Sequence, residues 1–590
     1  MQPSLPQSDA NPAERQRRLA RCRERYRYNY ELVPPLAMVD PLPVSELPRP
    51  KWALKVLDEG LKILENSIEN DPDRERREKR RKKRRRHRYK SLLTLGKILF
   101  TDGAEKAIGE LLNDIREGGA QGEGRALKDY DDLFQTIGLP AIAGTFQDDS
   151  SFARLRVAGP NPLVIQRMKG QRDDFPVTDG IFKAQPGFEN DSLAAALAEG
   201  RLYLADYREL AGLPPGDRPH GPKFSFAPKA LFARPSAATA LVPIAIQTGQ
   251  TPGPANPIFD PRQDEAWEMA KTAVEIADGI HHEMISHLGR THLLLEPYII
   301  ATHRQLPVNH PLFVLLDAHF EGTLFINDAA QAKLISTGGP VDLLLGASLD
   351  ASKTLAVNSV REHSLEEGYL FTELKARGVD DSAALPYYPY RDDAILVWQA
   401  IRRWVESYLR IYYHGDEDVA ADTELLSWTT ELLSHDGGRM RAFGPSGRLT
   451  TFAELAESMT MLIFTASAQH AAVNFPQKGI MSYTPAMPLA GYRATPGSSD
   501  GLTEADWLAM LPPLDMAELQ LQVLYLLGGV YYTRLGDYRK RQFKDDRVKP
   551  LLRAFQSELA QVEATIGERN RSREVYQYLL PSHIPQSTNI

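Results

Sequence analysis

The chain has 590 residues, of which 42% are hydrophobic and 25% charged, a composition typical of a globular protein that buries a large core. Its formal net charge is −7, and Cys22 is its only cysteine, which excludes an intramolecular disulfide and a cluster of thiolate ligands. Any metal site must therefore use nitrogen and oxygen ligands.

The first 25 residues are predicted to be a polar N-terminal tail, and residues 26–590 are expected to form one large domain. The tail lacks the apolar segment of a secretory signal. No stretch of about 18 uninterrupted apolar residues, the length that crosses a bilayer, follows it. We therefore expect a cytoplasmic protein.

A basic insertion covers about residues 71–90. Between Arg74 and Lys90 there are 13 Lys and Arg residues against two Glu, a net charge of +11. Such a run is usually a solvated helix or a disordered insertion, but Arg74–Arg88 could also give peripheral contact with an anionic membrane, where each basic residue contributes about 1 kcal/mol. Tyr89 is the only aromatic residue in the run, and no base-reading motif accompanies it, so a nucleic-acid partner is not expected.

Apolar residues at helical spacing recur from Lys51 onwards and predict a mainly α fold. The expected helices after the basic insertion cover Ser91–Glu117, Ala126–Ile137, Trp267–Leu295, Ile395–Tyr413, Asp422–Ser434, Phe452–Phe475 and Met516–Leu535. Ala230–Gln247 instead predicts two short strands around a Pro/Ser/Ala turn, which adds a small β element.

The segment IHHEMISHLGRTH, in the third of these helices, places His287 and His292 five residues apart. Five residues turn an α-helix by about 500°, so the two side chains would point about 140° apart. They can share a metal only if the helix is locally widened, as in a π-type turn with hydrogen bonds from i to i+5.

A zinc protease is the first alternative, because His282 and Glu283 begin a segment like HExxH. The sequence reads HExxxH, one residue too long for both histidines to share a face of an α-helix. A structural zinc site is also disfavoured, since such sites usually use cysteines. The histidines could otherwise be hydrogen-bonded residues of a helical core.

The pattern as a whole favours a metal centre. Four of the 14 histidines fall within 12 residues, and His470 and Asn474 lie four apart, a spacing that puts both on one face of a helix. Ile590 ends the sequence with a free carboxylate. Imidazole, amide and carboxylate ligands without sulfur suit a borderline ion such as iron.

The chain resembles a lipoxygenase over most of its length after Asp148. The matching segments are DDSSFARLRVAGPNPLVIQR, PIAIQ, WEMAK, HHEMISHLGRTHLLLEPYIIATHRQLPVNHPLFVLL, FIND, QHAAVNFPQ and the closing PSHIPQSTNI. The resemblance implies one large helical catalytic domain of the bacterial type. No counterpart of the N-terminal β-sandwich lipid-binding domain of plant and animal members is expected in this sequence, because its first 150 residues lack regular alternating strands.

By this resemblance, one non-haem iron is bound by His287, His292, His470, Asn474 and the terminal carboxylate of Ile590. The ligand types alone do not exclude manganese. His282, Glu283 and Gln477 are expected to form hydrogen bonds behind these ligands. The helix is expected to carry a π-type insertion around Ser286 to Arg290.

The implied activity is dioxygenation of polyunsaturated fatty acids of the linoleate type, which hold a cis,cis-1,4-pentadiene. A ferric hydroxide abstracts hydrogen, and O2 then adds to the pentadienyl radical. Ala330 stands where alanine accompanies S hydroperoxides in the family and glycine R ones, so an S product is expected, and Leu334 and Leu526 are expected to line the substrate channel. The alternative is a catalytically silent, lipid-binding or membrane-associated relative.

Overall fold

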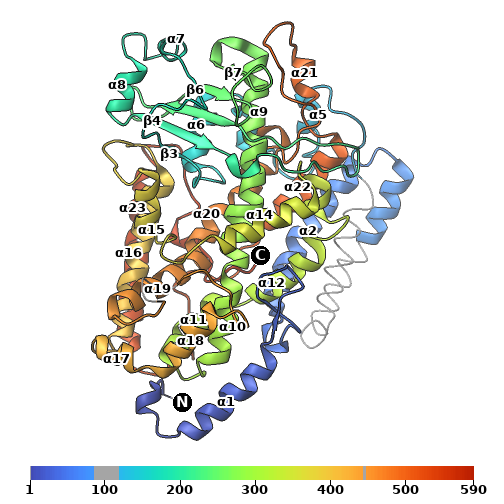
Figure 1. Cartoon of the computed structure of the whole chain (residues 1–590). Coiled ribbons are helices and arrows are strands. Elements are labelled where there is room, and N and C mark those ends of the chain that lie inside the picture. The colour runs from blue at the N-terminus through green and yellow to red at the C-terminus, as the bar shows by residue number, and fades with distance from the viewer. Residues whose placement is uncertain (1, 85–118, 443–446) are drawn as a thin grey trace.

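The computed structural model describes residues 2–84, 119–442 and 447–590 (Figure 1). Helices dominate these residues, and the strands form a small sheet of two strands and another of five. The expected mainly α fold with a small β element is therefore confirmed. The expected helix Ser91–Glu117 and the end of the basic insertion lie outside the described residues.

The five-stranded sheet lies at one end of the molecule, beside α6, α7 and α8 (Figure 1). Its strands are antiparallel in the order β3-β4-β5-β6-β7. β5 and β6 are the two strands expected from Ala230 to Gln247. The strands of both sheets are β1 (Tyr28–Asn29), β2 (Met38–Val39), β3 (Gln166–Arg167), β4 (Leu202–Asp206), β5 (Lys229–Ala233), β6 (Val242–Gln247) and β7 (Ile258–Phe259).

A long helical run crosses the centre of the molecule. It consists of α9 (Asp264–His281), a π-helix (His282–Leu293) and α10 (Leu295–Gln305). Most of its side chains are buried on every side, which is the pattern of a core helix. The expected helix from Trp267 to Leu295 is confirmed, and it extends further in both directions.

Buried charges fix this run to α6. Arg156 Nη2 lies 2.7 Å from Glu275 Oε2 and 3.2 Å from Asp278 Oδ2. Asn161 Nδ2 donates to Asp278 Oδ1 at 2.8 Å, and Ser286 Oγ donates to Asn161 Oδ1 at 2.7 Å. A buried ion pair is costly to break once formed, so this network fixes where the π-helix begins.

The remaining helices pack around the central run. Those before it are α1 (Pro12–Arg25), α2 (Pro50–Asn70), α5 (Leu127–Asp131), α6 (Asp149–Ala158), α7 (Asp179–Lys183) and α8 (Leu193–Ala198). Those after it are α11 (Pro311–Phe320), α12 (Thr323–Ala329), α13 (Pro340–Leu344), α14 (Leu349–Arg361), α15 (Leu370–Arg377), α16 (Pro389–Leu409), α17 (Asp416–Ala421), α18 (Thr423–Leu433), α19 (Phe452–Phe464), α20 (His470–Asn474), α21 (Glu504–Leu508), α22 (Leu514–Leu527) and α23 (Val548–Arg569).

Two expected helices are shorter in the structure. Only Leu127–Asp131 of the first is α-helical, and α22 ends at Leu527 rather than Leu535. Gly528 follows the end of α22, and a Cβ there would lie 2.5 Å from the backbone nitrogen of Lys478, so only glycine permits this close approach.

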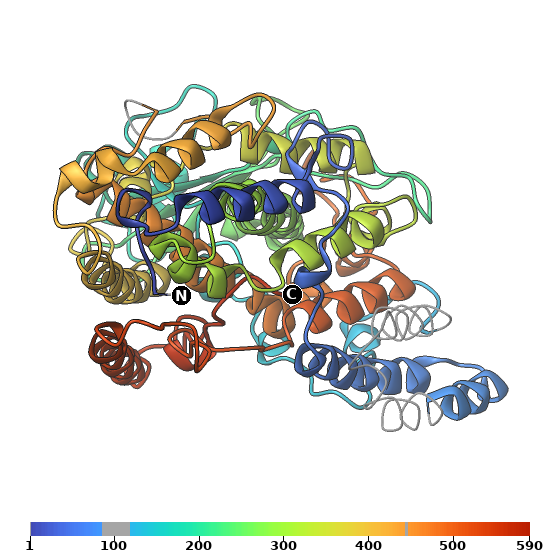
Figure 2. The ribbon, with the colours of Figure 1, turned by 90° about the horizontal axis from the view of Figure 1, so that it is seen from below.

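The N-terminal residues lie along the surface of the helical core. Helix α1 is attached by Arg15, whose guanidinium donates to both carboxylate oxygens of Glu424 on α18. Helix α2 and the helical residues 74–84 project at one side of the molecule in Figure 2. No described helix is both long and apolar enough to cross a bilayer.

Candidate metal centre

Three histidines from two distant parts of the chain meet in the core. His292 Nε2 lies 3.3 Å from His287 Nε2 and 3.2 Å from His470 Nε2. All three side chains are buried. Among the described residues, they form the only group of three or more His, Cys, Asp or Glu side chains close enough to share an ion.

The π-helix resolves the five-residue spacing of His287 and His292. Its widened turn carries bonds from i to i+5, such as Leu294 N–H to Gly289 O at 2.9 Å, and brings both imidazoles to one face. The π-type insertion expected around Ser286 to Arg290 is confirmed. Gly289 lets α14 approach, because a Cβ there would lie 2.0 Å from Ser359 Oγ.

Asn327 of α12 fixes the orientation of His292. Its Nδ2 donates to His292 O at 3.1 Å and to Glu296 Oε2 at 2.8 Å, so its Oδ1 is the atom that faces His292 Nδ1 at 3.1 Å. His292 must therefore carry its proton on Nδ1. The lone pair of Nε2 is left facing the other two histidines, as in a metal ligand.

Glu296 extends this network to the N-terminal segment. Its Oε1 accepts from the backbone N–H of Val39 at 2.8 Å. Burial raises the pKa of Glu296 to about 7, although the bonds from Val39 and Asn327 act in the opposite direction. The carboxyl group thus joins strand β2, the central run and α12 at one point.

His282 lies directly behind His287. The two rings stack with centroids 5.5 Å apart, and His282 Nε2 donates to Val473 O at 2.8 Å. Glu283 Oε1 lies 3.4 Å from His282 Nδ1. His282 therefore connects the π-helix to α20, the helix that carries His470, and is not one of the three converging histidines.

Asn474 is held by two neighbours. Its Nδ2 donates to Leu527 O at 2.9 Å, and its Oδ1 accepts from Gln477 Nε2 at 2.9 Å. The side chain also lies beside His287, where it partly offsets the effect of burial on the pKa of that imidazole. An amide oxygen with one lone pair still available is thus fixed next to the histidines.

Ile590 is buried, and its main-chain oxygen lies beside His470. The preceding residues are fixed by hydrogen bonds from several elements. Trp52 Nε1 donates to Asn589 O at 2.6 Å, and Thr323 Oγ1 donates to Thr588 O at 2.7 Å. The last residues are therefore part of the core, near the middle of the molecule (Figure 2).

The three imidazoles are neutral at physiological pH. Burial lowers the pKa of His292 to about 4. Burial also lowers the pKa of His287 and His470 well below the ordinary value, and repulsion from neighbouring histidines lowers both further. Neutral imidazole is the form that binds metals.

The donor set fits a metal ion. Two nitrogens that bind one ion at about 2.1 Å and at right angles lie about 3.0 Å apart, and a wider angle separates them further. The observed Nε2 separations of 3.2 and 3.3 Å agree with this geometry. Amide and carboxylate oxygens beside three imidazoles match the ligand preferences of iron and manganese.

The expected channel residues lie on two further elements. Ala330 is buried and begins a short π-helix, Ala330–Leu334, in which Leu334 is half-buried. Leu526, near the end of α22, is half-buried and packs against the apolar cluster that contains Ile590. The roles of Ala330, Leu334 and Leu526 in the substrate channel stay predictions.

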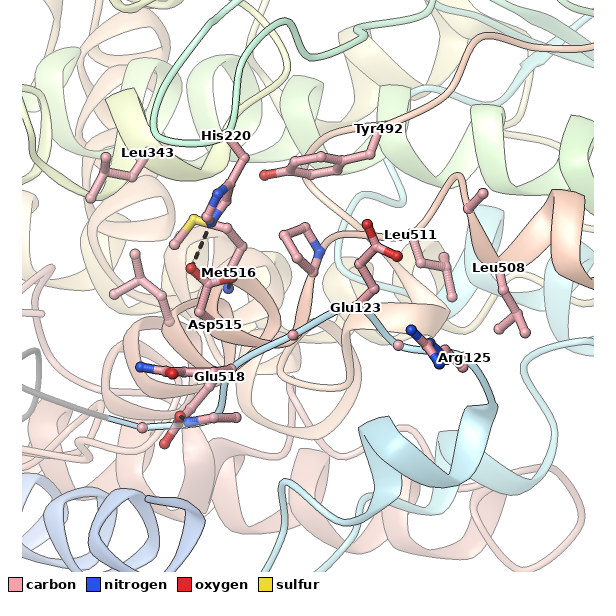
Figure 3. Close-up of a pocket in the computed structure, with 18 of the residues that line it drawn as sticks. Glu123, Arg125, His220, Leu343, Tyr492, Leu508, Leu511, Asp515, Met516 and Glu518 are labelled. Atoms are coloured by element: carbon pink, nitrogen blue, oxygen red, sulfur yellow. Dashed lines mark hydrogen bonds and ion pairs between the residues drawn. The ribbon is translucent and has the colours of Figure 1, made fainter. Parts of the chain in front are cut away.

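Figure 3 shows a cavity of about 1330 Å³ beside the first half of α22. Leu343, Met516 and Leu519 give it apolar walls, and His220 Nε2 lies 2.6 Å from Asp515 Oδ2 at one side. Helix α22 continues for about 16 Å from Met516 to Leu527, whose carbonyl accepts from Asn474. One helix thus lines both the cavity and the candidate site.

Sequence reasoning missed Asn327 and Glu296. Both lie inside segments of the lipoxygenase resemblance, but nothing in their spacing marks them as partners of His292. Their polarity within apolar, helical surroundings was the available signal, because a buried polar side chain requires a hydrogen-bonding partner.

Comparisons with known proteins agree with this geometry. The Lipoxygenase family model matches residues 135–586. A linoleate 9/13-lipoxygenase of Pseudomonas aeruginosa is 39% identical, over 100% of this chain and 93% of its own. The human polyunsaturated fatty acid lipoxygenase ALOX15B is 35% identical, over 79% of this chain and 69% of its own. A crystal structure of a lipoxygenase with arachidonate has a TM-score of 0.85 at 28% identity, covering 100% of this chain and 84% of that one.

We expect Asn327→Leu to weaken metal binding by about 10–100-fold, because leucine cannot accept the Nδ1 proton of His292. The measurement is competition for the metal with a chelator of known affinity. Asn358→Leu, at an exposed position of α14, is the matched control. Thermal unfolding of the metal-free proteins separates lost stability from lost metal affinity. An unchanged affinity in Asn327→Leu would show that this hydrogen bond does not orient a ligand.

Proposed function

This chain belongs to the lipoxygenase family and is a fatty-acid dioxygenase, and from that premise we propose that it converts linoleate-type polyunsaturated fatty acids to S hydroperoxides at one non-haem iron. The observation that carries the proposal is the convergence of three neutral imidazoles, with the lone pair of His292 Nε2 facing the other two. Manganese is the alternative ion.

We assign the ligands to His287, His292, His470, Asn474 and the carboxylate of Ile590. When bound, such an ion supplies the one-electron chemistry by which O2 reacts with a closed-shell lipid. The protein positions the ligands. Asn327 orients His292, and His282 packs against His287. Gln477 and the carbonyl of Leu527 form hydrogen bonds with the side chain of Asn474. Buried apolar residues around the centre exclude water, which strengthens each of these polar contacts.

The carboxylate of Ile590 offers the most direct test. A semisynthetic protein that ends in a carboxamide keeps the shape of residue 590 but removes its charge. We expect its iron content to fall at least tenfold and the conjugated-diene absorbance formed from linoleate to fall with it. Ile590→Val, which keeps the carboxylate, should retain most of the iron. A carboxamide protein with full iron content would contradict the assignment.

We propose that Ala330 controls the side from which O2 adds, and that Leu334 and Leu526 line the acyl channel. The support is indirect: Ala330 is buried at the start of a π-helix, and Leu526 packs close to Ile590. An acyl chain that came in through the cavity of Figure 3 would follow α22 towards Asn474.

Replacing Ala330 by glycine removes a methyl group and opens space on one face of the substrate radical. We expect Ala330→Gly to raise the R fraction of the linoleate hydroperoxides, measured by chiral chromatography. Ala332→Gly, at an exposed position of the same π-helix, should leave the S product dominant. A wild-type enzyme that formed only R product would overturn the role of Ala330.

We further propose that the basic segment makes peripheral contact with anionic lipid. Several of its described arginines are already paired: Arg81 with Glu69, Arg84 with Glu65, and Arg80 with Asp71. Arg74, Lys79 and Lys82 are exposed and form no hydrogen bond or close ion pair with a described residue. Part of the charge of the described residues is therefore already compensated, and these three exposed side chains are the ones we propose for lipid contact.

We expect Lys79→Glu/Lys82→Glu to reduce sedimentation with phosphatidylserine-containing vesicles at least tenfold, since each basic residue near the surface contributes about 1 kcal/mol. The difference should shrink as salt is added. Lys540→Glu/Lys544→Glu changes the net charge equally at another exposed site and is the matched control. Equal loss in both pairs would show that only the net charge matters.

A further inference from the structure

The C-terminal tail, residues 584–590, is buried but belongs to no helix or strand. The last regular element before it is a short 3-10 helix, Pro581–His583, whose Ser582 is exposed. The chain therefore enters the core after His583 and ends there. Because the tail is not part of a helix or a sheet, contacts with other elements must fix where the carboxylate of Ile590 lies.

Residues 319–323, at the end of α11 and the start of α12, lie alongside the tail. Three hydrogen bonds join the two segments, and they follow the same order along both of them. They are His319 Nδ1–Gln586 O at 2.8 Å, Ser587 Oγ–Glu321 O at 2.8 Å and Thr323 Oγ1–Thr588 O at 2.7 Å. The two segments therefore run in the same direction, and these bonds set the register between them.

Gly322 permits this close approach. Its φ is +86°, in the left-handed region that favours glycine, and a Cβ there would lie 3.2 Å from Asn589 Cβ. The turn between α11 and α12 thus follows the tail closely.

The imidazole of His319 is the donor in the first of these bonds. Gln586 O can only accept, so Nδ1 carries the proton, and burial lowers the pKa of His319 to about 4, so Nε2 carries none. Nε2 accepts instead from the hydroxyl of Tyr538 at 2.8 Å, and the oxygen of that hydroxyl accepts from Trp404 Nε1 at 2.9 Å. A buried chain of hydrogen bonds that begins on α16 thus directs one N–H group to the tail.

His319 also connects Gln586 to the helical core. The N–H of Gln586 donates to Thr533 Oγ1 at 3.1 Å, and its Oε1 accepts from the N–H of Gly536 at 2.9 Å. Both partners belong to residues 528–547, which form no helix or strand. Of these three contacts of Gln586, the one from His319 is therefore the one that comes from a helix.

The register of the tail decides where its carboxylate lies. Consecutive Cα atoms are about 3.8 Å apart. A slip of one residue would therefore move the end of the chain by more than the length of a metal–oxygen bond, which is about 2 Å. Such a slip would separate Ile590 from His470, beside which its main-chain oxygen lies.

We propose that His319 is a positioning residue for the metal centre: its N–H to Gln586 O sets the register of the tail and so brings the carboxylate of Ile590 to His470. The inference rests on the proposed assignment of Ile590 as a ligand. The hydrogen bonds of His319 go to Tyr538 and Gln586, so it acts on the centre through the tail.

Two amide variants of the full-length, metal-loaded protein separate this role from packing, because both remove the imidazole ring. In His319→Asn, the amide nitrogen can take the place of Nδ1 and donate to Gln586 O. In His319→Gln, the longer side chain reaches the place of Nε2, and Gln586 O loses its donor.

Release of Ile590 by a serine carboxypeptidase, followed by mass spectrometry, reports how firmly the tail is held. We expect release to be about tenfold faster from His319→Gln, because a buried carbonyl without a donor is costly, and within about twofold of wild type from His319→Asn. The affinity for the metal, measured by competition with a chelator, should fall in His319→Gln and be largely restored in His319→Asn. His435→Gln, at an exposed position, is the matched control and should change neither quantity.

Tyr538→Phe gives the same test with the imidazole in place, since it removes only the hydroxyl that orients His319, and release should rise by a smaller factor. Unchanged release from His319→Gln and Tyr538→Phe, or equal release from the two amide variants, would overturn the positioning role and leave the ligand assignment intact. Faster release from His319→Gln with an unchanged metal affinity would instead contradict the assignment of Ile590, and the positioning role with it.

Discussion

The widened turn between His287 and His292 is the constraint on which the rest of the core depends. A regular α-helix would point these imidazoles to different sides, and the π-helix brings both to face His470. The wider turn must be accommodated by its neighbours. Gly289 lets α14 approach closely, and Ser286 is anchored through Asn161 to the ion pair of Arg156 with Asp278. These contacts of the neighbouring helices therefore stabilise the π-helical turn that carries His287 and His292.

Burial explains both why the three histidines are neutral and why the residues around them form so many hydrogen bonds. A dry environment keeps the imidazoles neutral, but it also makes every unpaired polar atom costly. Hydrogen bonds offset part of this cost. Asn327 pairs with His292, His282 with the carbonyl of Val473, and Gln477 with Asn474. Not every polar atom there is paired, since His282 Nδ1, His470 Nδ1 and Gln477 Oε1 have no hydrogen-bond partner.

Much of this could be predicted from the sequence, because local patterns determine it. The five-residue spacing of His287 and His292 required a π-type turn, and the helical periodicity around them gave the central run. The sequence could not give Asn327 and Glu296 as partners of His292, since only packing brings α12 and β2 to that helix. The end of α22 at Leu527 was also missed, as was the close approach of Lys478 to the Gly528 that follows it. The assignment of iron ligands and the S product stays a prediction.

The hydrogen bond from Val39 to Glu296 has a consequence for where the catalytic unit begins. The family model starts at residue 135, yet Val39 supplies the donor to a carboxyl group that shares Asn327 with His292. Trp52, also outside the match, holds the backbone of Asn589. A protein trimmed to the matched residues would lose both donors next to the centre. The start of the family-model match is therefore not the start of the physical unit around the centre, which includes the strand and helix that come before it.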